Sequence, residues 1–115
     1  MSGDEKGLMV SYEEYLNMHF CIGEIVDCTE VKNSMKLLNF KVRIGERIIQ
    51  VISGLKGYDE VWAMVGKRVL VLTNLKPITM GGVTSEGVIL SAEDREGHLS
   101  LIVPEKTIEV GAEVC

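Results

Sequence analysis

The feature that most constrains the fold is a run of strict alternation over residues 38–44, followed by a glycine turn and a second apolar run. Successive side chains of a β-strand point to opposite faces, so a period of two predicts a strand with one buried face. Gly45-Glu46 supplies a tight turn, and residues 47–53 return as a β-branched run, which together predict a hairpin. The inward positions are Leu38, Phe40, Val42 and Ile44, and the outward positions are Asn39, Lys41 and Arg43.

Further elements are predicted on both sides of this hairpin. Residues 20–30 form a strand around Gly23, a glycine that suits a bulge or a sharp curvature. Residues 59–65 have the spacing of one short helix ended by Gly66, and residues 68–73, 85–92 and 99–103 are further strands. Before them, Ser11-Tyr12-Glu13-Glu14 matches a capping box, which predicts a short helix through about Asn17.

The predicted order is three strands, one short helix and two more strands. A mainly β, five-stranded Greek-key barrel with a short helix between strands three and four is the oligonucleotide-binding (OB) fold, which binds ligands on the face of strands two and three. A small sandwich or a different barrel also fits the pattern alone. At 115 residues we expect one domain over residues 11–115, preceded by a flexible lead-in over residues 1–10.

Charge is unevenly distributed along the chain. The net charge is -5, which at first argues against a nucleic-acid partner. Residues 32–76, however, hold nine basic groups against three acids, a local +6, and the rest of the chain has a local -11. This distribution fits a basic face on an acidic body, although the same residues would also suit strand faces that are merely solvated.

Other function classes find little support in the residues. His19 and His98 have no nucleophile or phosphate-loop motif near them, so we expect no catalytic residues and no enzyme activity. Cys21, Cys28 and Cys115 are an odd number without a C-x-x-C pair, so neither a disulfide framework nor a metal or cofactor site is expected. Cys21 and Cys28 are interpreted as small apolar residues of a strand.

The compartment is predicted from two features. The apolar runs are too short to cross a bilayer. The first seven residues are polar and acidic, unlike a secretory signal. We therefore expect a cytoplasmic protein with no membrane contact.

Three further stretches of the sequence are informative when taken together. They are Asn33-Ser34-Met35-Lys36-Leu37-Leu38, Val51-Ile52-Ser53-Gly54 with Val65-Gly66-Lys67, and Asn74-Leu75-Lys76-Pro77 with Gly82-Val83-Thr84-Ser85-Glu86-Gly87. Together they resemble the tRNA-binding domain family of methionyl-tRNA synthetase C-termini and free-standing tRNA-binding proteins. The resemblance runs from about residue 12 to the C-terminus. It implies an OB barrel that recognises tRNA by shape and backbone, alone or as an accessory (beta-type) subunit of methionyl-tRNA synthetase.

The resemblance also implies positions for the sites. Free-standing members are usually homodimers, and the contacts here would come from Tyr12 to Met18 and Val110 to Cys115. Lysines could pair with phosphates, and asparagine or serine could bind sugar, phosphate or base edges; Asn74 and Ser85 would alternatively cap strand ends. The implied RNA-facing positions are Asn33, Lys36, Asn74, Lys76, Ser85 and Glu86, to which the outward strand face adds Lys41 and Arg43.

The sequence departs from the family pattern at several positions. Ile78, Thr79 and Gly81 stand in a loop where most members place basic residues, and Cys21 stands where arginine is frequent. Aromatic residues are few, with Trp62 interpreted as a core or helix-packing residue, which favours recognition of RNA shape over single-strand stacking. The rival hypothesis is a protein-binding chaperone or assembly factor with an apolar surface formed by Ile78, Met80, Val83, Val88 and the terminal segments.

Overall fold

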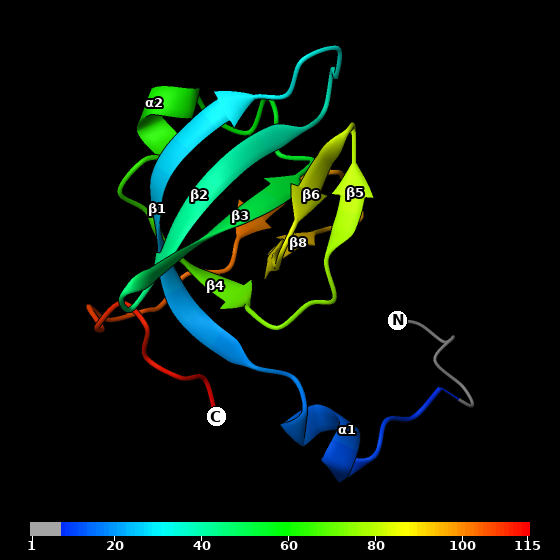
Figure 1. Cartoon of the computed structure of the whole chain (residues 1–115), viewed down its shortest axis with the longest axis vertical. Helices are drawn as coiled ribbons and strands as arrows, with labels where there is room; N and C mark the ends of the chain where they lie inside the picture. Colours follow the sequence, from blue (N-terminus) through cyan, green and yellow to red (C-terminus); the bar gives the residue numbers. More distant parts are fainter. Residues whose placement is uncertain (1–7) are drawn as a thin grey trace.

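In the computed structural model, which describes residues 8–115, two short helices and nine strands follow one another along the chain (Figure 1). Residues 1–7 of the expected lead-in lie outside the described part, and residues 8–10 have no regular secondary structure. The helices are α1 (Tyr12–Leu16) and α2 (Val61–Met64). The strands are β1 (Phe20–Glu30), β2 (Leu38–Ile44), β3 (Arg47–Ser53), β4 (Arg68–Leu72), β5 (Ile78–Met80), β6 (Val83–Ser85), β7 (Val88–Ile89), β8 (Ser91–Glu93) and β9 (Leu99–Leu101).

The main sheet is antiparallel and has the strand order β3-β2-β1-β4-β7, so the mainly β barrel of OB type is confirmed, with α2 between β3 and β4. Strand β1 organises the sheet, because its first half pairs with β4 and its second half with β2. The register with β2 shifts between Ile25 and Asp27, which places a bulge at Val26. Bulges bend and twist a strand, and the ribbon accordingly curls around a central core (Figure 1).

Gly23 lies beside the point where β1 changes partners, and the bulge suggested for it falls instead at Val26. A Cβ atom built on Gly23 would lie 2.6 Å from Val42 Cγ1 and 2.8 Å from Ile44 Cδ1, closer than real contacts allow. The glycine is therefore required by close packing across the curled sheet.

The core fills the inside of the curl. The alternation predicted for β2 is confirmed, since Leu38, Phe40, Val42 and Ile44 are buried while the residues between them are half-buried. Cys28 is buried beside them, and burial followed by the charge of Asp27 raises the pKa of its thiol to about 11. It therefore stays protonated and packs as a small apolar residue. The other fully buried core side chains include Ile25, Val51, Met64, Val69 and Val71.

The open seam between β3 and β7 is bridged by Ser85, the last residue of β6, and by Glu86, the residue after it. The side chain of Ser85 accepts from the Ile52 amide at 2.9 Å and donates to the Gly87 carbonyl at 3.0 Å. The Glu86 carboxylate accepts from the Gln50 amide at 2.7 Å, and its own amide donates to the Gln50 carbonyl at 2.8 Å. Side chains thus satisfy the free edge of β3, where a regular ladder would otherwise be needed.

The second half of the chain is more broken than the sequence predicted. The strand expected over residues 85–92 is divided between β7 and β8, and the last strand ends at Leu101. Residues 78–85, for which the sequence predicts mostly a loop, form the β5-β6 hairpin. Its turn is Gly81-Gly82, with φ of 59° and 81°, and such left-handed pairs suit two-residue hairpin turns. Three-residue strands are too short for a period of two to be visible.

Helix α2 is a single turn, shorter than the 59–65 predicted, and the interpretation of Trp62 as a core or helix-packing residue was wrong. Met64 is fully buried and Val61 packs partly against the core, three residues earlier on the same face. Trp62 lies on the other side of the turn and is 76% exposed. A helix this short offers only one inward face, and the two aliphatic side chains occupy it.

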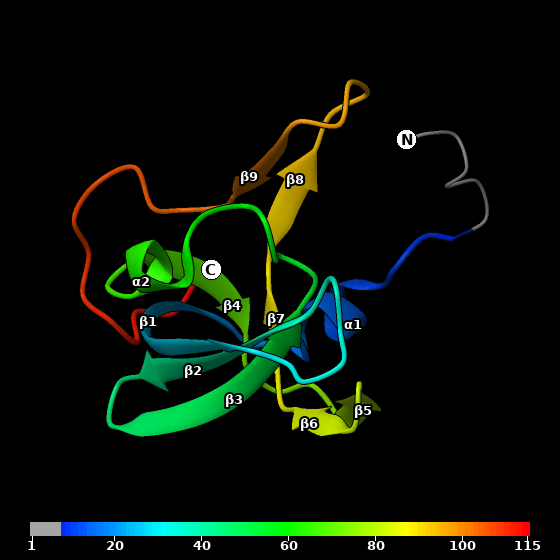
Figure 2. The same ribbon diagram turned by 90° about the horizontal axis from the view of Figure 1, so that it is seen from above.

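Helix α1 and the C-terminal segment lie together beside the start of β1. At the N-terminus the predicted capping box of α1 is confirmed, with Ser11 and Glu14 exchanging side-chain and backbone bonds. The C-terminal segment returns along the first half of β1, where the Ile22 amide donates to Ala112 and the Val114 amide to Phe20. Figure 2 shows this segment passing around the α2 side of the barrel, while β5 and β6 lie on the other side.

Replacing Ser85 with alanine tests the side-chain seam. The Ile52 amide and the Gly87 carbonyl would be left buried without their partner, which costs about 1–3 kcal/mol. We expect the free energy of unfolding in urea to fall by that amount. Ser91→Ala is the matched control, because Ser91 is exposed on β8, and it should change stability by less than about 0.5 kcal/mol. Equal effects of the two variants would contradict the role given to Ser85.

Candidate nucleic-acid interface

The β5-β6 hairpin is framed by loops that carry exposed lysines. A Cβ atom on Gly81, in the hairpin turn, would lie 3.0 Å from Leu37 Cδ1 and 3.3 Å from Val31 Cγ1, so this turn packs against the β1-β2 loop. Lys36 is exposed in that loop, next to Leu37. Lys76 is exposed at the other end, two residues before β5. Figure 1 shows the β1-β2 loop above the hairpin and the β4-β5 connection below it.

The β1-β2 loop has a defined backbone. Ser34 Oγ accepts from the amides of Lys36 and Leu37 at 3.2 and 3.0 Å, and the Lys36 carbonyl accepts from the Lys56 amide. Asn33 is exposed in the same loop and has a φ of 65°, a conformation that asparagine tolerates better than most residues. The structure thus places the predicted residues Asn33 and Lys36 in one ordered loop.

Lys41 reaches the same hairpin from the outer face of β2. Its Nζ donates to Gln50 Oε1 at 2.8 Å and lies 3.5 Å from Asn39 Oδ1. Gln50 in turn donates from Nε2 to the Thr84 carbonyl of β6 at 2.8 Å. Lys41 is therefore connected to the hairpin through one side chain. We call the set Lys36, Lys41 and Lys76 the basic rim.

Arg43 lies on the outer face of β2 as predicted, but it stands apart from the basic rim. Its guanidinium pairs with Glu24 of β1 at 2.5 Å and donates to the Gly45 carbonyl in the β2-β3 turn. Within residues 8–115, none of the ion pairs involves Lys36, Lys41 or Lys76. Within this part of the chain, the charges of the rim lysines are therefore not compensated by an ion pair, whereas the charge of Arg43 is largely compensated by Glu24.

Three predicted site residues make internal contacts. Ser85 is fully buried and bonded inside the seam, and the Glu86 carboxylate is bonded to the Gln50 amide. Asn74 accepts from the His19 amide at 3.0 Å and donates to the Asn17 carbonyl at 2.7 Å, which ties the chain after α1 to the end of β4. The alternative of a structural role, open from the sequence for Asn74 and Ser85, fits these contacts. Ser85 is therefore left out of the proposed interface.

The reading of the sequence missed Gln50 and Thr84. Gln50 is the one polar residue inside the apolar run over residues 48–52, and its outward position follows from its pairing with Lys41. That polar residue was the available signal. The bond to Thr84 had no signal, because it requires β6 to lie against β3, and this depends on the seam.

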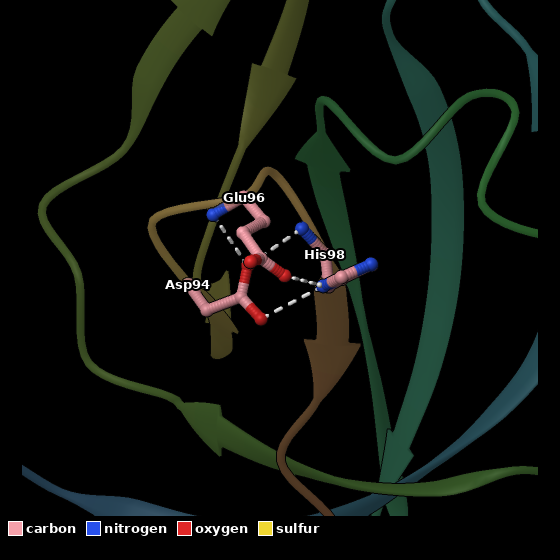
Figure 3. Close-up of side chains that lie close together, drawn as sticks. All are labelled: Asp94, Glu96 and His98. Atoms are coloured by element: carbon pink, nitrogen blue, oxygen red, sulfur yellow. Dashed lines mark hydrogen bonds and ion pairs between the residues drawn. The ribbon is translucent and has the colours of Figure 1, made fainter.

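A second cluster of charged side chains lies in the turn between β8 and β9. Figure 3 shows Asp94, Glu96 and His98 pointing toward one another, and their ligand-type atoms lie within 4.8 Å. Asp94 Oδ1 accepts from the amides of Glu96 and His98 at 3.0 and 2.9 Å, and Oδ2 lies 2.9 Å from His98 Nδ1. These bonds close the turn. All three residues are exposed, and the arrangement is explained as a turn stabilised by its own aspartate.

An apolar surface forms where α1 meets the C-terminal segment. No residue of α1 is buried, and Tyr12, Leu16 and Met18 are exposed. Beside them, Phe20 of β1 and Val114 of the C-terminal segment line an open pocket of about 230 Å³ together with Tyr15, Leu16, Met18, His19, Glu113 and Cys115.

Among residues 8–115, no helix has the length and apolar character needed to span a membrane.

The fold and the rim define a small β-barrel of the OB class that presents lysines around one hairpin. Residues 20–113 match the family described as the putative tRNA binding domain, and the chain belongs to this family. Among the relatives are methionine–tRNA ligases of Methanocaldococcus jannaschii, 43% identical over 105 residues, and of Deinococcus radiodurans, 35% identical over 106 residues. The alignments cover 91% and 92% of this chain but 16% of each ligase, so the chain spans about one sixth of their length.

Solved structures show the same architecture. A MetRS-related protein from Pyrococcus horikoshii superposes with a TM-score of 0.84 at 25% identity, covering 93% of this chain and 98% of that one. The CsaA chaperone protein of Picrophilus torridus superposes with a TM-score of 0.82, covering 93% of this chain and all of that one. Its 18% identity shows a shared fold alone.

The turn between β8 and β9 yields a prediction about pH. The His98 side chain is the main cause that lowers the pKa of Asp94 below its ordinary 3.8, followed by the amides of His98, Glu96 and Gly97. A lowered pKa means that the ionised carboxylate stabilises the turn at pH values above the pKa of the unfolded state. This stabilisation is lost as the pH falls through the pKa of the folded state. A carboxyl NMR titration should show this shift, and His98→Ala should move the pKa of Asp94 back toward 3.8. An unchanged pKa in that variant would contradict the assignment.

Proposed function

We propose that this chain binds tRNA through the basic rim, recognising shape and backbone more than base sequence. The observation that carries the proposal is that Lys36, Lys41 and Lys76 frame one hairpin and take part in none of the ion pairs within residues 8–115. Membership of the tRNA-binding domain family supports the same conclusion. Asn33, in the loop of Lys36, is proposed as a further contact to sugar or phosphate.

Electrostatics support this surface despite the net charge of -5. A lysine without a carboxylate partner can release counterions from a phosphate, which is the main source of affinity for nucleic-acid backbones. Arg43 would first have to leave Glu24, so its contribution should be smaller than that of a rim lysine. The local field around the hairpin therefore matters more than the total charge.

Recognition by shape is supported by the position of the aromatic residues. Phe40 is fully buried, so it cannot stack on a base. Trp62 is exposed, but it belongs to α2, which lies away from β5 and β6 in both views of the barrel (Figures 1 and 2). Neither Phe40 nor Trp62 offers a stacking surface beside the rim, which favours backbone contacts to a folded RNA over single-strand stacking.

We further propose that the chain acts with a methionyl-tRNA synthetase in the cytoplasm, as a free-standing or accessory binding module without catalytic residues of its own. This rests on the methionine–tRNA ligase relatives, of which it matches about one sixth. The protein-binding alternative, which also involved the terminal segments, has less support at the β5-β6 hairpin, because of the four apolar residues suggested there only Ile78 is exposed, at 45%. Met80, Val83 and Val88 are half-buried.

A homodimer is proposed through the apolar surface between α1 and the C-terminal segment. Helix α1 has no buried residue. Its Leu16 is 54% exposed, and Val114 of the C-terminal segment is 42% exposed. A two-fold contact would cover both patches at once, since the same surface is used on each copy. The expected elements, residues 12–18 and 110–115, are brought together by the pairing of the C-terminal segment with β1.

A tRNA titration at several salt concentrations tests the main proposal. Affinity should fall as salt rises, and the variant Lys36→Ala/Lys76→Ala should bind several-fold more weakly, with the log–log slope reduced by about 1.5 because two phosphate contacts are lost. Lys106→Ala is the control, since Lys106 belongs to the C-terminal segment and lies beside Arg68 of β4. Binding that is absent or independent of salt would refute the proposal, as would equal losses in the control.

The homodimer is tested by placing a charge on α1. Leu16→Glu should convert a dimer into a monomer in light scattering or sedimentation, while the melting temperature of the barrel changes little, because Leu16 is not part of the core. Met35→Glu, at an apolar position in the β1-β2 loop that is more exposed than Leu16, should stay dimeric. A wild-type monomer at high concentration, or a dimer that survives Leu16→Glu, would argue against this surface.

A further inference from the structure

Gln50 stands at the centre of a polar network that joins three strands. Its side-chain oxygen accepts from Lys41 Nζ at 2.8 Å and from Asn39 Nδ2 at 3.4 Å, both on β2. Its side-chain nitrogen donates to the Thr84 carbonyl on β6 at 2.8 Å. One amide group thus connects the outer face of β2 to the β5-β6 hairpin.

The orientation of this amide is determined by its partners. A lysine ammonium can only donate and a backbone carbonyl can only accept, so the oxygen of Gln50 must face Lys41 and its nitrogen must face Thr84. The backbone is held as well, because the amide of Gln50 donates to the Glu86 carboxylate and its carbonyl accepts from the Glu86 amide. Gln50 is therefore a fixed acceptor for Lys41.

Lys41 is held in a way that preserves its charge. Its two partners, Gln50 and Asn39, are neutral, whereas Arg43 on the same strand pairs with the carboxylate of Glu24. The cross-strand neighbour of Lys41 on β1 is Asp27, with which it forms no ion pair. An ammonium has three donors, and two are engaged, so one remains for a ligand on the outer surface.

Holding the ammonium in advance favours binding. A free lysine side chain has many rotamers, and fixing it on a phosphate lowers its entropy. Here most of that ordering has already occurred in the unbound protein. The gain requires partners that do not neutralise the charge, which is the property that Gln50 provides and a glutamate would not.

We propose that Gln50 is a positioning residue that holds Lys41 ready to contact an RNA phosphate. The inference rests on the proposed function and adds to it the group that prepares one of its contacts. The same glutamine links Lys41 to β6, so the hairpin framed by the basic rim and the ammonium on β2 keep a constant relative position.

A double-mutant cycle with the full chain and bulk tRNA tests this. Gln50→Met removes the hydrogen bonds while keeping a side chain of similar size, and we expect it to weaken binding about threefold. In a Lys41→Ala background the same change should alter affinity by less than about 1.5-fold, because there is no ammonium left to position. Additive losses would mean that Gln50 acts only through the stability of the hairpin, and would overturn the proposal.

A second variant separates positioning from folding. Both Gln50→Met and Gln50→Glu lose the donor to Thr84, but the glutamate would hold Lys41 and neutralise it. Gln50→Glu should therefore reduce the salt slope by about 0.7–0.9, as Lys41→Ala does, whereas Gln50→Met should leave the slope near that of the wild type. Equal slopes for the two variants would overturn the proposal. If the wild type itself does not bind tRNA, the proposed function fails instead.

Discussion

The structure depends on the way in which the free edge of β3 is satisfied. A curled sheet of five strands leaves the amides of Gln50 and Ile52 pointing toward a gap, and unpaired buried amides are costly. The hydroxyl of Ser85, the last residue of β6, and the carboxylate of Glu86, the residue after it, fill this role. Side chains can do so where the chain bends too sharply for a ladder. The barrel is thus closed by two residues rather than by a full strand.

This closure also determines the position of the candidate site. Because Ser85 and Glu86 fix the end of β6 to β3, the hairpin turn is brought against Leu37 in the β1-β2 loop, and Thr84 is brought to Gln50. The lysines of the basic rim come from three separate parts of the chain and surround one hairpin only under that condition. A residue in the seam would therefore influence the proposed RNA binding without touching RNA.

The first half of the fold could be predicted from sequence because its signals are local. Alternation in β2, the Gly45 turn and the capping box at Ser11 each act within a few residues, and each is confirmed. The β5-β6 hairpin could not be predicted in this way, since three-residue strands show no period. The large apolar side chain of Trp62 led us to expect a core or helix-packing role, which is wrong because a one-turn helix has room for only two inward side chains.

The candidate site was predictable in composition but not in arrangement. The basic excess over residues 32–76 is present, yet Arg43, Lys56 and Lys67 pair with acids that lie before or within that stretch. Counting charges along a chain cannot show which ones are compensated, because compensation depends on cross-strand neighbours such as Glu24 and Arg43. What distinguishes Lys41 is that its partners are amides. An acidic protein can in this way keep a few lysines fully charged where a polyanion would dock, and neutral hydrogen bonds are the means of doing so.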